Sequence, residues 1–516
     1  MLVADAAGAR AADSAAIAAG IPARALMQRA GAAAAAEIVR RYPEDIGAGA
    51  VIATGAGNNG GDGWVVAAAL HAVGIPVRVV ECLPAHTPDA RAEREAAIAA
   101  GVRCSTTIDD LLVGAERIAI DAILGTGLRP DTPLEGAAAS AVATLIARQR
   151  NHGSRIVALD VPSGMNADDG LDVAGLRCAL TLAFGTLKRC HVVSRAGCGD
   201  IVLLDIGLGR HAEASRGAAL ATPRWFRAAL PPIAADAHKG TRKKIAIIGG
   251  APGMAGATIL AARAALRSGA GLVKCVVAPE SLPAVQEAEP AALAAPWPAD
   301  DATLEREVTR WADAILLGPG LGRDGARAFV ERVLRAFRGP VVLDADALNA
   351  FAGEAAMLAP LLHERPALLT PHPAEFGRLV VRDVEEVLGD RFTLPARLAA
   401  DAAAAVLLKG VPTVVAARNG DVMVVAEGTP TLATGGAGDL LGGIAVTMLA
   451  QTEDAALAGA LAAYAHGKAA WLVSPRAVRG YTLDDVLLAL PVVWSLPAPP
   501  PRPPVLAELP AVGERA

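Results

Sequence analysis

The chain has 516 residues, enough for two or more domains that each bury a full core. Its 48 basic and 53 acidic residues nearly balance, so the composition favours neither a nucleic-acid partner nor a membrane surface. Much of the apolar content is alanine, and no apolar run approaches the ~20 residues of a membrane span. We therefore expect small-molecule substrates, no nucleic-acid partner and no membrane.

The N-terminus and the cysteines point to the cytoplasm. Asp5 comes early in the chain, without a basic lead or the compact apolar core of a secretion signal. The six cysteines are scattered and form no Cys-x-x-Cys pair. Reduced, buried thiols are therefore favoured over a disulfide framework or a zinc site, and we expect a cytoplasmic protein.

The first half of the chain alternates short apolar runs with helical patterns. Residues 1–42 have a helical pattern, with a break at residues 20–22. A short apolar run lies at residues 50–53. The strands expected after it are 77–81, 117–124, 155–161, 179–184 and 201–206. The expected helices are 62–73, 89–100 and 136–150. This alternation predicts βαβ units and a mainly parallel, covered sheet.

The second half repeats the alternation after a stretch with little periodicity, in which residues 230–240 resemble a linker. The expected strands are 244–250, 272–278, 314–317, 341–344, 367–370, 406–409, 413–417 and 422–425. Residues 496–510 are rich in proline and predict an extended or disordered tail. The sequence thus predicts an α/β protein with domains at 1–211 and 222–495 and a tail at 496–516.

The loop at residues 55–63, Gly-Ala-Gly-Asn-Asn-Gly-Gly-Asp-Gly, joins a strand to a helix. Glycines let the backbone turn tightly and approach a ligand, and an uncapped helix start attracts an anion. The spacing Gly-x-Gly-x-x-Gly matches the dinucleotide fingerprint, and Glu81 stands where a ribose-binding acid belongs. Asn58-Asn59 and the residues at 61–63 are not part of that fingerprint, so it carries little weight alone.

Three polar loops follow apolar strands, at residues 55–63, 121–131 and 159–164. In a parallel sheet such loops share the edge at which ligands bind. Asn59, Asp121 and Ser163 offer only oxygen ligands, which suit a hard cation rather than zinc or copper. Asp160, at a strand end, is suited to general acid/base catalysis. Each loop alone is explained as well by an ordinary turn, but their combination favours a ligand site.

These motifs resemble the NAD(P)H-hydrate epimerase domain over about residues 1–211. The lead Leu26-Met-Gln-Arg-Ala-Gly31 fits as well, with Gln28 where that family often has Glu. The resemblance implies a Rossmann-like three-layer domain that epimerises hydrated NADH and NADPH (NADHX and NADPHX) at C6, with Asp160 catalytic and a potassium ion at Asn59, Asp121 and Ser163. The implied substrate-binding residues are Asn58, Asn59, Gly60, Gly61, Asp62, Gly125, Thr126, Gly127, Leu128, Arg129, Pro130, Asp131 and Asp160. Lys188 falls near a basic position of the family, and its role stays open.

A second glycine-rich loop, Leu432-Ala-Thr-Gly-Gly-Ala-Gly-Asp-Leu-Leu-Gly-Gly443, opens a predicted helix. Its consecutive amides would form an anion hole for a transferring phosphoryl group, and Asp439 would be the base. The strand-end loop at 409–413 would bind a nucleotide phosphate. Alone, the glycine loop is equally a capped helix, and His372 alone is equally a capping or surface residue. The sequence contains no Gly-x-x-x-x-Gly-Lys-Ser/Thr P-loop.

Together with residues 249–257, 318–322, 343–349 and 370–375, these motifs resemble the ribokinase-like fold. Within that fold they resemble the ADP- or ATP-dependent NAD(P)H-hydrate dehydratase, over about residues 238–490. The resemblance implies a three-layer domain that dehydrates the S hydrate with ADP and magnesium as co-substrate, and Asp439 as the catalytic residue. The implied hydrate contacts are Ala257, Gly320, His372 and Asp439. The implied nucleotide contacts are Lys409, Gly410, Val411, Pro412, Thr413 and Gly438.

Two other functions remain open at this point. The chain could be a small-molecule kinase of the same fold, for a thiazole- or pyridoxal-like alcohol, with an N-terminal nucleotide-binding module. Alternatively, the first domain could be only a binding or scaffolding module. A kinase would accumulate a stable phosphoester, whereas a dehydratase would release phosphate and restore the absorbance of reduced nicotinamide. In either case we expect a homo-oligomer.

Overall fold

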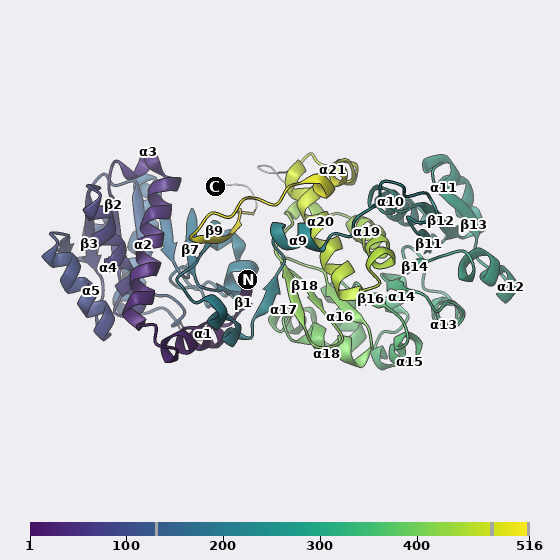
Figure 1. Ribbon diagram of the computed structural model, residues 1–516, viewed down its shortest axis with the longest axis horizontal. Coiled ribbons are helices and arrows are strands. Elements are labelled where there is room, and N and C mark those ends of the chain that lie inside the picture. The colour runs from purple at the N-terminus through teal and green to yellow at the C-terminus, as the bar shows by residue number, and fades with distance from the viewer. Residues whose placement is uncertain (129–132, 475–478, 513–516) are drawn as a thin grey trace. The chain divides into compact units, whose positions relative to one another are not determined.

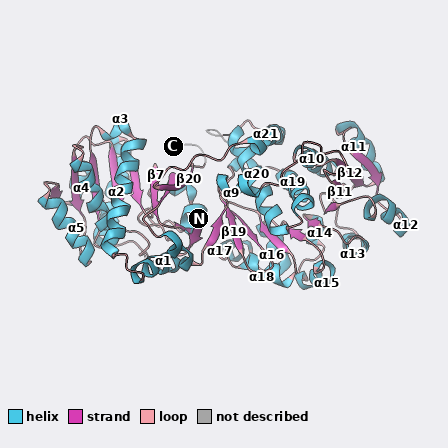
Figure 2. Ribbon diagram, viewed as in Figure 1, coloured by secondary structure: helices cyan, strands magenta, loops and turns pink. Residues whose placement is uncertain are grey.

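The computed structural model describes residues 1–128, 133–474 and 479–512, which divide into two compact units. Unit 1 contains residues 1–219 and the described residues from Pro500 onward, and unit 2 contains residues 220–499. Helices and strands alternate along both units, as Figures 1 and 2 show. The predicted α/β class with two domains is confirmed.

The central sheet of unit 1 has the strand order β4-β3-β2-β5-β6-β7-β9, with β20 beyond β9. All pairs from β4 to β9 are parallel. The strands are β2 (Ala50–Thr54), β3 (Val77–Glu81), β4 (Arg103–Ser105), β5 (Ile118–Ala122), β6 (Arg155–Leu159), β7 (Leu180–Phe184) and β9 (Asp200–Leu204). The chain order reverses between β2 and β5, so the loops after these two strands flank the point where open parallel sheets bind ligands.

Helices cover both faces of this sheet. Along β2, Ile52 packs with α2 and α4 on one face, while Val51 and Ala53 pack with α6 on the other, because successive side chains of a strand alternate. The helices are α1 (Ala6–Ala18), α2 (Ala23–Arg41), α3 (Pro43–Ile46), α4 (Asn58–Ala72), α5 (Pro88–Ala99), α6 (Gly136–His152), α7 (Arg189–Val193) and α8 (Arg195–Cys198). Outside the central sheet, β1 (Leu2–Ala4) pairs parallel with β8 (Leu187–Lys188) and antiparallel with β10 (Ala218–Leu220).

The sheet of unit 2 has the order β13-β12-β11-β14-β15-β16-β17-β18-β19. It is parallel up to β17 and antiparallel beyond, and its order reverses between β11 and β14. The strands are β11 (Lys244–Ile248), β12 (Leu272–Val277), β13 (Leu293–Pro296), β14 (Ala314–Leu317), β15 (Val341–Leu343), β16 (Ala367–Leu369), β17 (Ala405–Leu408), β18 (Thr413–Ala416) and β19 (Val422–Val425).

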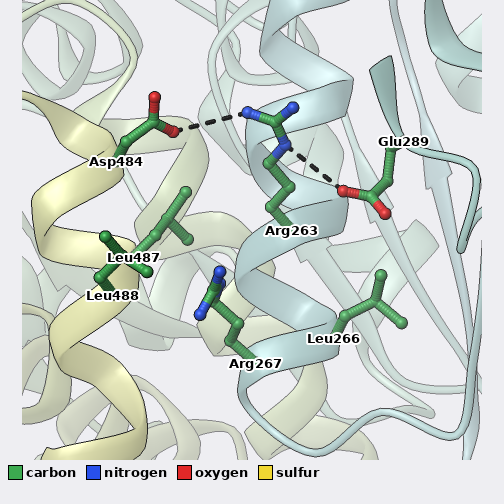
Figure 3. Close-up of a pocket in the computed structure, with 7 residues that line it drawn as sticks. All are labelled: Arg263, Leu266, Arg267, Glu289, Asp484, Leu487 and Leu488. Carbon is green, nitrogen blue, oxygen red and sulfur yellow. Dashed lines mark hydrogen bonds and ion pairs between the residues drawn. The ribbon is translucent and has the colours of Figure 1, made fainter. Parts of the chain in front are cut away.

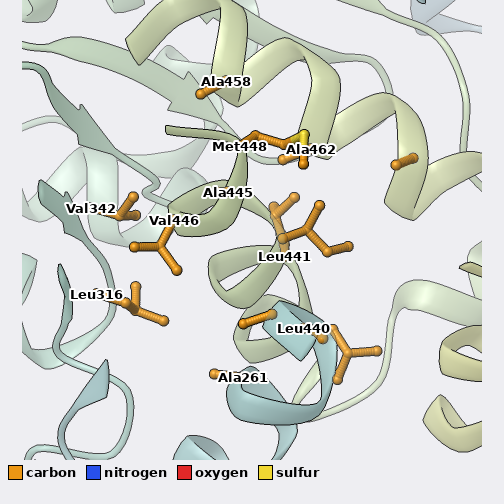
Figure 4. Packing of buried hydrophobic residues seen from close by; sticks show 14 of the residues in the cluster. Ala261, Leu316, Val342, Leu440, Leu441, Ala445, Val446, Met448, Ala458 and Ala462 are labelled. Carbon is orange, nitrogen blue, oxygen red and sulfur yellow. The ribbon is translucent and has the colours of Figure 1, made fainter. Parts of the chain in front are cut away.

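The larger core of unit 2 lies between this sheet and the helices α10, α19, α20 and α21. In Figure 4, Leu316 and Val342 of the sheet face Val446 of α19, while Leu440 of α19 lies near Ala261 of α10. A second core lies on the opposite face. The helices of unit 2 are α9 (Pro223–Ala229), α10 (Ala255–Arg267), α11 (Leu282–Ala288), α12 (Asp301–Leu304), α13 (Ala326–Ala336), α14 (Asp346–Asn349), α15 (Ala359–Leu362), α16 (Pro373–Val380), α17 (Val384–Gly389), α18 (Leu394–Asp401), α19 (Ala437–Thr452), α20 (Ala455–Val473) and α21 (Leu483–Ser495).

The proline-rich tail differs from the prediction. Instead of a free extended or disordered segment, it contains β20 (Val505–Leu509), which pairs antiparallel with β9. The physical reason is that β9 would otherwise expose a row of unpaired backbone groups, which β20 satisfies. The tail therefore belongs to the fold of unit 1.

No helix among the described residues is long and apolar enough to cross a membrane. The six cysteines are all free, and only Cys104 is exposed.

Candidate active sites

A cavity of about 440 Å³ opens at the switch point of the unit 1 sheet. Asn58, Asn59 and Asp62 from the start of α4 line it, as do residues 125–127 after β5 and Asp160 after β6. The three polar loops thus converge, as expected for loops after parallel strands. Of the remaining predicted substrate contacts, Leu128 is half-buried outside the cavity lining, and Arg129, Pro130 and Asp131 lie outside the described residues.

The glycines of the loop at 55–63 mostly serve backbone packing. A Cβ at Gly55 would lie 1.9 Å from the Ile123 carbonyl oxygen, and one at Gly60 would lie 2.0 Å from the Gly55 oxygen. Gly60 and Gly61 are buried and do not line the cavity. Gly57 alone among the loop's glycines lines it, with open space where a Cβ would stand. The loop therefore faces the cavity through Gly57 and the side chains of Asn58, Asn59 and Asp62.

Asp160 forms an ion pair with Lys188, whose role the sequence left open. The Lys188 ammonium lies 2.5 Å from Asp160 Oδ1 and also donates to the carbonyls of Phe184 (3.0 Å) and Thr186 (3.1 Å). Lys188 is buried, and both residues line the cavity. The cavity wall therefore holds a carboxylate whose counter-charge is fixed beside it.

Two further acids face the same cavity. Burial raises the pKa of Asp62 well above its usual range, and the nearby Asp160 and Asp13 raise it further. Burial also raises the pKa of Asp13, against the opposing effect of Lys188. Asp13 lies on α1 and belongs to no motif, so the sequence offered no sign of it. Carboxyls with raised pKa beside an ion-paired carboxylate suit a reaction that both donates and accepts protons.

The predicted cation ligands gather beside this cavity. Ser163 Oγ donates to Asp121 Oδ1 over 2.6 Å and accepts from the Leu124 amide over 2.9 Å, while Asn59 Nδ2 donates to the Leu124 carbonyl over 2.9 Å. Burial raises the pKa of Asp121 to about 6, although hydrogen bonds from Ser163 oppose it. Among the described residues, Asn59 Oδ1 is buried without a hydrogen-bond partner. An unpaired buried oxygen beside a buried carboxylate fits a hard cation.

In unit 2, Asp439 lies in the first turn of α19, near Lys409 and Asp344. Lys409 Nζ is 2.6 Å from Asp344 Oδ1, and a Cβ added at Gly438 would lie 3.2 Å from Lys409 Nζ. Burial and the charge of Asp344 raise the pKa of Asp439 to about 7, against the opposing effect of Lys409. Burial by itself lowers the pKa of Lys409, but Asp344 and Glu375 outweigh it and raise that pKa, so the lysine stays charged.

The start of α19 offers free donors. Gly436, with φ 91°, precedes the helix, and no side chain caps it. The first amides of a helix have no partner within it, so they point at any anion placed there. Predicted nucleotide contacts lie close by: Lys409 follows β17, and Thr413 Oγ1 donates to the Gly410 carbonyl over 3.0 Å. Val411 is exposed, and Pro412 follows it in the same loop.

Ala257 and Gly320 meet at the switch point between β11 and β14. Gly320 has φ 57°, its carbonyl accepts from the Ala251 amide over 2.7 Å, and a Cβ there would lie 3.2 Å from that of Ala257. His372 caps α16, because its Nδ1 accepts from the Ala374 amide over 3.1 Å. Burial and the charge of Lys409 lower the pKa of His372, so the helix cap also lies within reach of the Lys409 charge.

Another cavity of unit 2, of about 530 Å³, lies between α10 and α21 and contains none of the predicted site residues. Figure 3 shows Arg263 between Asp484 and Glu289, with ion pairs of 3.5 and 3.3 Å. Leu487 and Leu488, on the same helix as Asp484, also line the cavity. The charge of Arg263 is balanced by these two carboxylates, and Arg267 lines the cavity as well.

Comparison with known proteins gives matches in both units. Residues 245–491 match the family model of NAD(P)H-hydrate dehydratase, and residues 23–190 match that of the YjeF-related protein N-terminus. Bifunctional NAD(P)H-hydrate repair enzymes (Nnr) are similar over most of the chain. The one from Salinibacter ruber is 37% identical over 87% of this chain and 88% of its own length, and the one from Escherichia coli is 34% identical over 90% and 88%.

Moorella thermoacetica has a further such enzyme, 34% identical over 92% of both chains. Among solved structures, the ADP/ATP-dependent NAD(P)H-hydrate dehydratase from Bacillus subtilis, co-crystallised with ATP and Mg²⁺, is 29% identical. The match covers 54% of this chain and 98% of that one, with a TM-score of 0.46.

Proposed function

The chain belongs to the family of bifunctional NAD(P)H-hydrate repair enzymes, and from this premise we propose how its two units divide the work. The protein repairs hydrated NADH and NADPH by interconverting the R and S hydrates and by nucleotide-dependent dehydration of the S hydrate. We assign epimerisation to a domain at residues 1–211 and dehydration to a domain at 222–495. The pair Asp160–Lys188 at the unit 1 cavity supports the first assignment, and Asp439 beside Lys409 supports the second.

Epimerisation requires acid/base catalysis at C6, the carbon bonded to the ring nitrogen. The hydroxyl on C6 leaves as water after it takes a proton, while the ring-nitrogen lone pair forms a C=N bond. Water then adds to either face and loses a proton as the electron pair returns to nitrogen. We propose that Asp160 takes and returns these protons, while Asn58 and Asp62 help to hold the nucleotide. Lys188 keeps the Asp160 carboxylate in place through the 2.5 Å ion pair.

A potassium ion is the cation that we propose for Asn59, Asp121 and Ser163. The unpaired Asn59 Oδ1 and the buried Asp121 support this assignment. The ion would tie the start of α4 to the loops after β5 and β6. Replacing potassium by sodium or N-methylglucamine should lower the stability of unit 1, measured by thermal unfolding, and Asn59→Leu should abolish that ion dependence.

For dehydration we propose Asp439 as the base. It removes the proton of the C6 hydroxyl, whose oxygen attacks the terminal phosphoryl group of ADP and releases AMP. Phosphate then leaves with the C6–O electron pair, the ring nitrogen forms C=N, and loss of a C5 proton restores the dihydronicotinamide. The amides at the start of α19 face the transferring phosphoryl group. Lys409 and the loop that follows it hold the nucleotide, while Ala257, Gly320 and His372 contact the hydrate.

Magnesium would arrive with the nucleotide. Proteins usually hold Mg²⁺ through substrate phosphates and one or two carboxylates rather than through a dedicated cage. No group of three or more His, Cys, Asp or Glu able to hold a metal is found among the described residues. Asp344, whose Oδ1 lies 2.6 Å from Lys409 Nζ, is the carboxylate that would supply a protein ligand.

The decisive experiment incubates mixed-epimer hydrate with ADP or with ATP and follows phosphate release and nicotinamide absorbance together. We expect stoichiometric phosphate and full recovery of reduced nicotinamide, with ADP preferred. Accumulation of a stable phosphoester without recovered absorbance would instead identify a small-molecule kinase.

Two properties of the whole chain complete the proposal. The six free cysteines support a reducing, cytoplasmic location. The exposed Leu488 (62%) and Val492 (49%) on α21 support a homo-oligomer. Light scattering of the purified chain tests the second point, and a monomer at micromolar concentration would contradict it.

A further inference from the structure

His191 is a fully buried residue of unit 1 that belongs to none of the motifs. It lies on α7, three residues after Lys188. Its Nδ1 lies 3.0 Å from the backbone nitrogen of Lys188, and its Nε2 lies 2.7 Å from the carbonyl oxygen of Asp160. One imidazole therefore bridges the backbones of the two residues that form the ion pair at the cavity.

These two contacts fix the protonation state of the ring. A backbone N–H only donates, so Nδ1 must be an unprotonated acceptor. A backbone carbonyl only accepts, so Nε2 must carry the hydrogen. Burial and the charge of Lys188 lower the pKa of His191 to about 4, in keeping with a neutral ring.

Asp160 needs such support because its backbone is in the left-handed region, with φ 60°. That conformation is unfavourable for a residue with a Cβ and persists where surrounding contacts enforce it. The Asp160 amide donates to the Leu182 carbonyl over 2.8 Å, and Oδ1 accepts from the Phe184 amide over 3.2 Å and from Lys188. Among the described residues, His191 alone holds the Asp160 carbonyl.

We propose that His191 is a positioning residue of the epimerase site, which aligns the Asp160 carboxylate and the Lys188 ammonium through its two ring nitrogens. It touches neither substrate nor reacting atoms. If the Nε2 hydrogen bond is lost, the Asp160 peptide can rotate and the carboxylate leaves its place at the cavity. The inference rests on the proposed epimerase function of unit 1.

Two substitutions separate the two contacts. In His191→Asn the amide oxygen can take the place of Nδ1 and accept from Lys188, but nothing reaches the Asp160 carbonyl. In His191→Gln the amide nitrogen can take the place of Nε2 and donate to Asp160, but the acceptor for Lys188 is lost. His152→Asn, at the exposed end of α6, is the matched control.

The assay uses the full chain with pure R hydrate and excess ADP, so that the chain's own dehydratase reports each S hydrate formed. For His191→Asn we expect kcat for R hydrate to fall by about tenfold or more, with KM changed less than about twofold, since an unpaired buried carbonyl disturbs the carboxylate and not the nucleotide contacts. His191→Gln should retain most of the rate. Pure S hydrate should be consumed at the wild-type rate by every variant.

Other results would contradict the proposed role of His191. Unchanged kcat in His191→Asn would overturn the proposal. So would a loss of rate that merely follows the fraction of unit 1 unfolded in a thermal melt, because that is the behaviour of a helix cap. In ¹⁵N-histidine spectra of the full chain, the signal that is absent from His191→Asn belongs to His191. It should show a neutral ring with the hydrogen on Nε2 from pH 6 to 8. A charged ring, or a ring with the hydrogen on Nδ1, would also overturn the proposal. A wild-type chain that leaves R hydrate untouched would instead refute the epimerase function, and the spectra would still test the bridge.

Discussion

Asp439 is surrounded by charges that decide when it can act as a base. Burial, Asp344 and Glu375 together raise its pKa to about 7, while Lys409 acts in the opposite direction. A carboxyl with this pKa is protonated in mildly acidic solution and ionised above neutrality. The same residue is therefore a stronger base than an ordinary aspartate and more dependent on pH.

The pH dependence of dehydration follows from this pKa. Because the base must be ionised, kcat/KM for S hydrate should fall about tenfold for each pH unit below about 7 and level off above it. Asp439→Asn should remove nucleotide-dependent dehydration, whereas Asp401→Asn, on the exposed end of α18, should not. A pH–rate profile at hydrate concentrations well below KM checks this. Full activity of Asp439→Asn, or a flat profile from pH 5 to 8, would contradict the assignment.

Gln28 is the position where the family often has glutamate, and its contact explains the amide here. Gln28 Nε2 donates to Glu93 Oε1 over 2.8 Å, and Arg24 Nε donates to the same oxygen over 2.6 Å. Glu93 is buried and Gln28 is exposed, so a carboxylate at position 28 would face Glu93 across a hydrogen-bond distance from the solvent side.

We therefore expect Gln28→Glu to lower the unfolding free energy of unit 1 by about 1 kcal/mol at neutral pH, because solvent screens a like-charge pair at an exposed position. The loss should be smaller in acid, because the repulsion requires both carboxyls to be ionised. Chemical unfolding at pH 7 and pH 4 measures it. Gln286→Glu, on the exposed side of α11, should have no effect. Equal losses at the two pH values would show that repulsion is not the cause.

At the scale of elements, the proline-rich tail contributes a strand and an ion pair to unit 1. β20 pairs with β9, and Arg502 Nη1 donates to Glu37 of α2 over 2.9 Å. Burial would raise the pKa of Glu37, but hydrogen bonds from Arg40 and Arg502 outweigh it and lower that pKa to about 2. A glutamate with a depressed pKa stabilises the fold fully above about pH 4.5, and the contribution disappears as the pH falls towards 2.

Ending the chain at Leu496 should therefore damage unit 1 and spare unit 2. We expect a lower melting transition for unit 1 and a lower rate with R hydrate, because the edge of β9 becomes exposed and Glu37 loses a partner. The rate with S hydrate should stay unchanged. A chain that ends at Val512 is the control, since it keeps β20. Loss of the S-hydrate rate in the shorter chain would show that the tail also serves unit 2.

At the scale of the whole molecule, each unit has its own sheet, its own reversal of strand order and its own acid/base group. Neither proposed site borrows a described residue from the other unit. The dehydratase consumes one epimer and the epimerase supplies it, so the link between the sites is chemical.

Chains with one inactive site each should therefore complement one another. Asp160→Asn should consume the S hydrate of a mixture and then stop at the rate of spontaneous epimerisation, and Asp439→Asn should not dehydrate at all. Mixing the two should restore full conversion, because the epimer diffuses between chains. Recovery of nicotinamide absorbance measures this. Failure of the mixture would indicate that the hydrate passes only within one chain.

Much of the fold could be predicted because its signals are local. Strands 77–81, 314–317 and 422–425 coincide with β3, β14 and β19, and the break at residues 20–22 separates α1 from α2. Some strands were missed. β4 and β13 lie at sheet edges with mostly exposed side chains, so no apolar run marks them, and β1 lies within a stretch that has a helical pattern. β20 was missed because its partner β9 lies some 300 residues earlier in the chain.

The sequence by itself determined the α/β class, the two domains, the two glycine-rich loops and the family, because strand periodicity and loop motifs are carried by neighbouring residues. The tertiary structure decided which side chains meet. Asp13, Lys188 and His191 come to Asp160 from distant segments, and no local pattern announces such contacts. It also showed that Gly55 and Gly60 serve packing and that burial raises the pKa of Asp439. Burial and charge proximity are properties of the folded chain, so no motif encodes them.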